Sequence, residues 1–206
     1  MMVTRRDVRE RRRLRSRRLR AVLAGGLVLG IGVAATLAAW NDSEYGSASF
    51  TAGRFDIVGA VDGSTFSSHA TTGAAATLNF QLAPTAMAPG NATYALFSVK
   101  TANPSVAGTL QLTAGTPGGT GLATYLTYGV RTIAGTTCNA TTYAAGTAVV
   151  ADGSALTAGG SGTQAVTANG AAQVNYCFAV TLPTTAPNAA QGLSMTQTWQ
   201  FLGTSS

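Results

Sequence analysis

The stretch VNYCFAVTL, residues 174–182, decides the fold class. Aromatic and β-branched residues, which favour strands, stand at every second position: Val174, Tyr176, Phe178 and Val180. Because successive side chains of a strand point to opposite faces, this spacing predicts a strand with one large apolar face. No helix-length segment with a 3.6-residue apolar period stands out beyond residue 39.

Short runs of the same kind recur along the chain, separated by Gly, Pro, Asn and Ser. We expect further strands over residues 49–58, 77–82, 93–100, 109–113, 123–133 and 193–202. About seven to nine short strands with turn residues between them indicate an all-β sandwich or barrel. Residues 40–206 are expected to form one domain, which at this length buries roughly 70% of its unfolded surface.

The first 39 residues have the pattern of an export signal. A basic n-region, residues 1–20, precedes an apolar h-region, residues 21–39, that reads AVLAGGLVLGIGVAATLAA. As a helix the apolar run would extend about 28 Å, close to the thickness of a bilayer core. Because it ends in small residues, we expect cleavage. Small-residue preference favours a cut between Ala38 and Ala39, and an uncleaved signal peptide would be the chain's only link to the membrane.

The net positive charge of the chain comes from the basic residues of this leader. The sequence has 13 basic and 7 acidic residues, and ten of the basic ones precede Ala21. Arginine-rich tracts can bind nucleic acid, but here the tract adjoins a membrane-length apolar run, as expected for charge held on the cytoplasmic side during insertion. We therefore expect no nucleic-acid partner.

The two cysteines, Cys138 and Cys177, lie in the part of the chain that is expected to be secreted or held at the cell surface. In an oxidising compartment they are expected to form a disulfide, which would be a structural crosslink. Two buried free thiols are the alternative.

Residues able to do chemistry are few. The single histidine, His69, cannot supply a multi-histidine zinc site and is expected to be solvated in a polar loop. A Ser-His-Asp triad could be assembled from Ser67 or Ser68 with His69 and Asp62, but no nucleophile motif surrounds these serines. The chain is expected to be no enzyme and to need no cofactor. Weak cation binding by Asp42, Glu44 and Asp56 stays open.

The junction after the apolar run carries a resemblance to a known family. It reads TLAAWNDSE over residues 36–44, then SFTAG over residues 49–53 and FDI over residues 55–57. This pattern resembles the start of the camelysin/TasA family of secreted bacterial biofilm-matrix proteins. The resemblance implies an exported chain whose signal is cleaved by a dedicated endoplasmic-reticulum-type signal peptidase. It places the cut between Ala39 and Trp40.

The resemblance further implies a jelly-roll-like antiparallel β-sandwich that assembles into extracellular fibres. In such fibres the N-terminal segment of one subunit pairs as a strand in the next, which satisfies free edge N–H and C=O groups. We expect residues 40–55 to be that segment, with Trp40, Tyr45, Phe50 and Phe55 as its anchors. The partner would be another copy of the chain or a related fibre subunit. The alternative is that residues 40–58 form the first strand of their own sandwich.

Two other functions remain as alternatives. Camelysin-type proteins have been classed as metalloproteases, but the chain lacks the H-E-x-x-H motif. The other alternative is a monomeric cell-surface module that binds carbohydrate or protein. Tyr125, Tyr128 and Tyr143 could serve as its contact residues, although they more simply fill strands.

Overall fold

The computed structural model describes residues 13–27, 41–81 and 87–206. The chain divides into two compact units, Met1–Phe50 and Thr51–Ser206. In the first unit, residues 13–27 are helical, and residues 41–50 are neither helix nor strand. Among the described residues, no helix is both long enough and apolar enough to cross a membrane. The predicted cleavage sites around Ala38, Ala39 and Trp40 lie outside the described residues.

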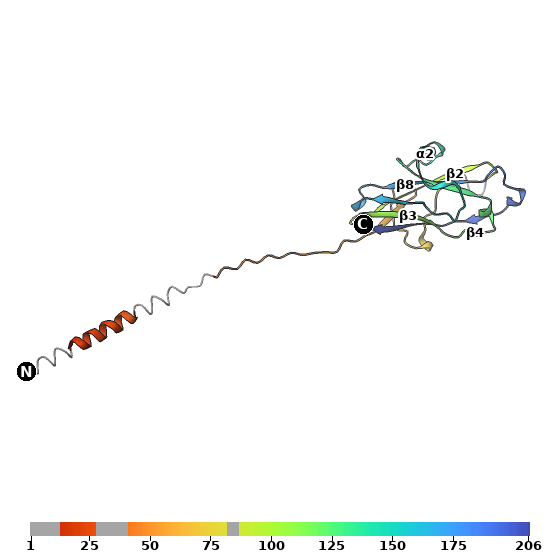
Figure 1. The fold of residues 1–206 in the computed structure, drawn as a ribbon. Helices are drawn as coiled ribbons and strands as arrows, with labels where there is room; N and C mark the ends of the chain where they lie inside the picture. The colour runs from red at the N-terminus through yellow and green to blue at the C-terminus, as the bar shows by residue number, and fades with distance from the viewer. Residues whose placement is uncertain (1–12, 28–40, 82–86) are drawn as a thin grey trace, which may run out of the picture. The chain divides into compact units, whose positions relative to one another are not determined.

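The second unit is an antiparallel β-sandwich, as the sequence predicts (Figure 1). Five strands form one sheet, in the order β1 (Ile57–Ala60), β2 (Ala92–Thr101), β8 (Val174–Thr181), β5 (Thr127–Ile133) and β6 (Thr147–Ser154). Three strands form the other, in the order β10 (Trp199–Ser205), β3 (Gly108–Ala114) and β7 (Thr163–Val166). The chain crosses between the sheets from β2 to β3 and from β6 to β7, which places strands distant in sequence side by side.

Short elements join the strands. A two-stranded ladder pairs β4 (Gly118–Gly119) with β9 (Met195–Thr196). The short helix α2 (Ala140–Ala144) contacts β5 and β8. Single turns of 3-10 helix are η1 (Thr72–Ala74), η3 (Leu122–Thr124), η4 (Ala168–Gly170) and η5 (Asn188–Ala190).

Aromatic side chains from both sheets meet in the core. Tyr176 and Phe178 on β8 are fully buried, and Trp199 and Phe201 on β10 pack against them from the other sheet. The ring centroids of Phe178 and Trp199 lie 4.9 Å apart, and those of Tyr176 and Phe201 lie 4.5 Å apart. Because the inward side chains stand at alternate positions, the spacing in residues 174–182 that predicts a strand also supplies its core face.

A second, smaller core lies on the outer face of the five-stranded sheet. It contains the side chains between those of the main core, such as Leu96 on β2 and Cys177 on β8, together with Tyr143 of α2. Cys177 forms the predicted disulfide with Cys138, and the two Cα atoms are 5.3 Å apart. The disulfide attaches the segment before α2 to the middle of β8, and it indicates an oxidising environment.

Several strand predictions are confirmed and others are wrong. Residues 93–100, 109–113 and 174–182 correspond closely to β2, β3 and β8. The prediction for residues 123–133 is too long because η3 occupies its first turn, and residues 193–202 are divided between β9 and β10. The structure describes ten strands, including two of two residues, against an expected seven to nine.

The first predicted strand is also shorter than expected. Residues 41–56 are neither helix nor strand, and β1 begins at Ile57, which pairs with Thr101 at the end of β2. Beyond Thr101 the chain turns at Asn103-Pro104, and proline has no N–H to continue a ladder. The expectation that residues 40–58 form one strand is therefore wrong for the described residues before Ile57.

Candidate functional site

Three features are candidates for function and are described one by one: an N-terminal arm, an anchor at residues 54–56, and an apolar cleft in the sandwich. The arm is defined here as residues 41–53. It carries Tyr45 and Phe50, whose side chains are 95% and 94% exposed. Exposed rings of this size cost free energy in water, because each would gain roughly 1.5–3 kcal/mol on burial. The arm therefore carries two apolar groups that would gain from a binding surface.

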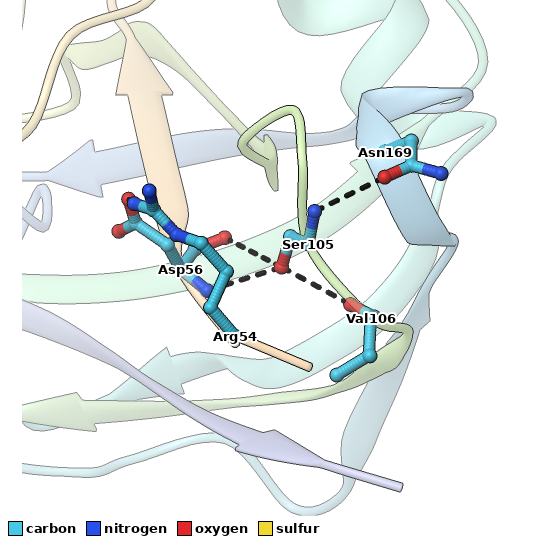
Figure 2. Close-up of polar contacts among 5 residues, drawn as sticks. All are labelled: Arg54, Asp56, Ser105, Val106 and Asn169. Carbon is cyan, nitrogen blue, oxygen red and sulfur yellow. Dashed lines mark hydrogen bonds and ion pairs between the residues drawn. The ribbon is translucent and has the colours of Figure 1, made fainter. Parts of the chain in front are cut away.

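Ser105 fixes the point at which the chain enters the sandwich, as Figure 2 shows. Its Oγ accepts from the backbone N–H of Asp56 at 3.1 Å, and Asp56 O lies 3.3 Å from the same hydroxyl. Val106 N–H donates to the carbonyl oxygen of Arg54 at 2.9 Å. The side chains of Arg54 and Asp56 form an ion pair at 2.7 Å. Residues 54–56 are thus bound to the loop after β2 although they are not a strand.

Asn169 supports Ser105 from a different loop. Its Oδ1 accepts from the backbone N–H of Ser105 at 3.1 Å, and its own N–H donates to Ser105 O at 3.0 Å. Asn169 has a φ of 56°, in the left-handed region where asparagine is one of the few tolerated side chains. The anchor therefore depends on a reciprocal contact that joins η4 to the loop after β2.

Phe55 belongs to the sandwich of its own chain. Its ring lies against Gly108 of β3 and Gly203 of β10, where added Cβ atoms would come within 2.6 Å and 2.7 Å of it. Glycine at both positions creates the space that the ring fills. Of the four residues predicted to anchor assembly, Trp40 lies outside the described residues, Tyr45 and Phe50 lie on the arm, and Phe55 packs in the core.

An open cleft of about 970 Å³ is lined by residues of both sheets. One wall contains β1 and the inward face of β2, and the other contains β9 and β10. Residues 68–72 and 75–78, with Phe80, line it as well. Its large apolar lining residues include Phe80, Met87, Phe97, Leu126, Met195 and Phe201. β1 and β10 are edge strands of their sheets. β10 has a side without a neighbouring strand in the described sandwich, whereas Gly59 on the outer side of β1 pairs with Ser67.

The strand predicted over residues 77–82 is not formed by residues 77–80, and part of this segment lines the cleft instead. Residues 77–80 are neither helix nor strand, although Gln81 N–H donates to Tyr94 O of β2 at 3.1 Å. Phe80 packs against the main core. The alternation of apolar residues in this segment therefore arises because they line the cleft. Residues 77–80 do not pair as a strand.

The tyrosines proposed as contacts of a surface binding module are mostly internal. Tyr128 and Tyr143 are buried, and Tyr125 packs partly against the main core. The Tyr128 hydroxyl donates to Ala158 O, and the Tyr143 hydroxyl donates to the carboxylate of Asp152. Tyr128 and Tyr143 therefore complete the two cores and are not surface contact residues.

Asp152 forms a polar cluster with Tyr143 and Arg131. Arg131 Nη2 lies 2.6 Å from the Asp152 carboxylate, and its guanidinium lies 5.0 Å from the centre of the Tyr143 ring. The hydrogen bond from Tyr143, with help from Arg131, lowers the pKa of Asp152. Burial, with the adjacent carboxylate, raises the pKa of Tyr143. The cluster ties α2 to β5 and β6, which is a structural role.

Two of the acidic residues considered for cation binding have partners within their own unit. Asp42 accepts from its neighbour Ser43 N–H at 2.9 Å, and Asp56 is paired with Arg54. Among the described histidine, cysteine, aspartate and glutamate residues, no group of three is placed to hold a metal ion.

His69 is more ordered than the sequence indicates. It is half-buried, its Nε2 lies 3.0 Å from Ser67 Oγ, and its Nδ1 lies 3.0 Å from Ala74 O. Asp62 does not complete a triad, since it accepts from the backbone N–H groups of Ser64 and Thr65. The Thr65 side chain, together with these backbone N–H groups, holds the pKa of Asp62 well below its usual range. The expectation of a freely solvated histidine is wrong.

Compared with models of known protein families and with curated proteins, the chain matches none.

Proposed function

We propose that the chain is a secreted structural protein, a fibre subunit whose arm docks into the cleft of a second copy. The observation that carries the proposal is the arm itself: two aromatic side chains, Tyr45 and Phe50, are almost fully exposed five residues apart. A chain that presents both an unpartnered apolar segment and an apolar cleft has the two complementary surfaces of a head-to-tail assembly.

The lengths are compatible with strand addition. Thirteen arm residues extend to roughly 43 Å as a strand, whereas the seven residues of β10 need roughly 23 Å. An added strand would gain backbone hydrogen bonds along a free edge and place alternate side chains in the cleft. Tyr45 and Phe50 are five residues apart and would point to opposite faces of such a strand, so one of the two rings would enter the cleft. The anchor at Ser105 would keep the arm attached to its own sandwich at a fixed point.

The charge of the exported part is also compatible with close contact between copies. Residues 40–206 carry three basic and five acidic residues, a net charge of −2, and two of each form the ion pairs Arg54–Asp56 and Arg131–Asp152. Repulsion between copies is therefore small, so that apolar burial and backbone pairing would drive assembly. The Cys138–Cys177 disulfide and the leader support export to the cell exterior.

The test compares the mature chain starting at Trp40 with one starting at Ser49, over a concentration series. Negative-stain electron microscopy and sedimentation are expected to show filaments of the longer form and monomers of the shorter one. The replacement Y45S/F50S is expected to act like the deletion, while the matched control S43A/S47A assembles normally. Equal assembly of the Ser49 form would refute the role of the arm.

A mixing experiment separates arm donation from general adhesion. The Ser49 form keeps its cleft but has lost most of its arm, so that it would accept an arm without donating one. Added in small amounts to the Trp40 form, it is expected to shorten the filaments in proportion to its share. If the Trp40 form stays monomeric at every concentration, the proposal fails and a monomeric cell-surface binding module becomes the better explanation.

A further inference from the structure

Ser67 lies in a fixed position beside the cleft. Its N–H and C=O groups both bond to Gly59 of β1 at 3.0 Å, so that its backbone continues an antiparallel pairing with that strand. The Ser67 side chain is exposed, and its Oγ lies 3.0 Å from Nε2 of His69. The hydroxyl is therefore both accessible and held by a rigid element.

The hydrogen bonds of His69 determine where its proton lies. The carbonyl oxygen of Ala74, 3.0 Å from Nδ1, can only accept, so Nδ1 carries the hydrogen in the neutral ring. Nε2 then presents its lone pair to Ser67, and the Ser67 hydroxyl is the donor. A nucleophile that donates to a base, which a third group orients, is the arrangement that activates serine in acyl transfer.

The cleft supplies a place for an apolar group next to this pair. Ser68 and His69 line it, and the His69 ring centroid lies 6.4 Å from that of Phe97, which belongs to the apolar wall. Ser67 is not itself a lining residue, but its Oγ is 3.0 Å from Nε2 of His69, which is one. An acyl chain lying along this wall would have to extend past His69 for its carbonyl carbon to reach Ser67.

We propose that Ser67 is a nucleophile, activated by His69, that takes an acyl group from an ester with an apolar acyl chain. The Ser67 Oγ–carbon bond forms and the ester carbon–oxygen bond breaks. The hydroxyl proton passes to His69 Nε2 and then to the leaving alcohol, and water releases the acyl group by the reverse sequence. Acyl transfer to Ser67 is separate from the proposed fibre role and does not depend on the arm.

The test treats the mature chain with p-nitrophenyl butyrate and follows p-nitrophenolate release, with peptide mapping of the acylated residue. The acyl group is expected on Ser67. Because a positioned general base contributes about 10²–10⁴-fold, Ser67→Ala and His69→Gln are expected to slow release at least 10²-fold. The matched control Ser64→Ala, an exposed serine three residues away that does not line the cleft, is expected to react like the unchanged chain.

Two results would overturn the proposal. One is acylation spread over several hydroxyl groups, and the other is a rate in His69→Gln equal to that of the unchanged chain. As a second measurement that needs no variant, a fluorophosphonate probe is expected to label Ser67 in the folded chain and to lose that labelling when urea unfolds it. Equal labelling before and after unfolding would contradict activation by the fold.

Discussion

Ser105 bonds both backbone polar groups of Asp56 through a single hydroxyl, with Oγ 3.1 Å from Asp56 N and 3.3 Å from Asp56 O. Ser105 itself is only 5% exposed. This contact secures the segment just before β1, where the arm meets the sandwich. A chain that donates its arm to a neighbour would transmit any pull on the arm to this point.

Replacing Ser105 with Ala is expected to loosen the entry of the arm. The partly buried N–H of Asp56 would lose its acceptor, at a cost of about 1 kcal/mol in the free energy of unfolding. Residues 54–56 would then open more often, so that trypsin is expected to cut after Arg54 faster than in the unchanged chain. Mass spectrometry of limited digests measures the rate, with Ser49→Ala on the arm as the control. Unchanged protection of Arg54 would show that the anchor does not depend on Ser105.

The disulfide is expected to carry a large part of the stability. It closes a loop of 39 residues, which the chain-entropy model values at roughly 3.5–4 kcal/mol. The double replacement C138S/C177S is expected to lower the free energy of unfolding in urea by about that amount. Since Cys177 is fully buried, dithiothreitol is expected to reduce the native bond slowly and to reduce it fast only in urea. Rapid reduction of the folded chain would contradict this burial.

The sequence predicts best those strands whose own apolar side chains alternate in the pattern that the core requires. Residues 174–182 form a central strand because their alternation supplies both cores, and β2 follows the same rule. The strands β6, TAVVADGS, and β7, TQAV, escape prediction because neither has a sustained alternation of large apolar residues. Their positions are set by pairing with β5 and β3, which no local pattern encodes.

The candidate site divides in the same way. The aromatic residues of the arm and the cysteine pair are visible in the sequence. The contact of Ser105 with Asp56 is not, since the two residues are 49 positions apart and the hydroxyl has no distinctive neighbours. The order around His69 is also hidden, because its second partner is a backbone carbonyl and any residue could supply one.

Phe201 is expected to join the two sheets more strongly than its neighbour on β10. Its ring contacts Phe97, Tyr176 and Phe178 across the sandwich. Phe201→Ala is expected to cost about 3 kcal/mol, because it opens a cavity between the sheets. Leu202→Ala is the matched control: Leu202 is 53% exposed, and a change within about 0.5 kcal/mol is expected. Urea unfolding followed by tryptophan fluorescence compares the two, and equal losses would contradict the assigned faces of β10.

Acid is expected to destabilise the sandwich partly through Asp152. The hydrogen bond from Tyr143 and the ion pair with Arg131 lower the pKa of this carboxyl in the folded chain. Its contribution is therefore fully present above the unfolded value, about 3.9, and is lost as the pH falls through the lower folded value. Asp152→Asn is expected to make the free energy of unfolding depend less on pH below about 4, as measured by urea midpoints.

The variant Tyr143→Phe tests the cause of that pH dependence. Removing the hydroxyl removes the largest contribution to the lowered pKa of Asp152, so the acid dependence is expected to weaken here too. Because both variants act on the same carboxyl, their effects on the slope are expected to overlap in the double variant. Asp62, whose pKa is lowered by the Thr65 side chain and by the N–H groups of Thr65 and Ser64, shares none of these partners with Asp152. Asp62→Asn is therefore expected to weaken the acid dependence additively, and overlap between Asp62 and Asp152 would contradict two separate sites.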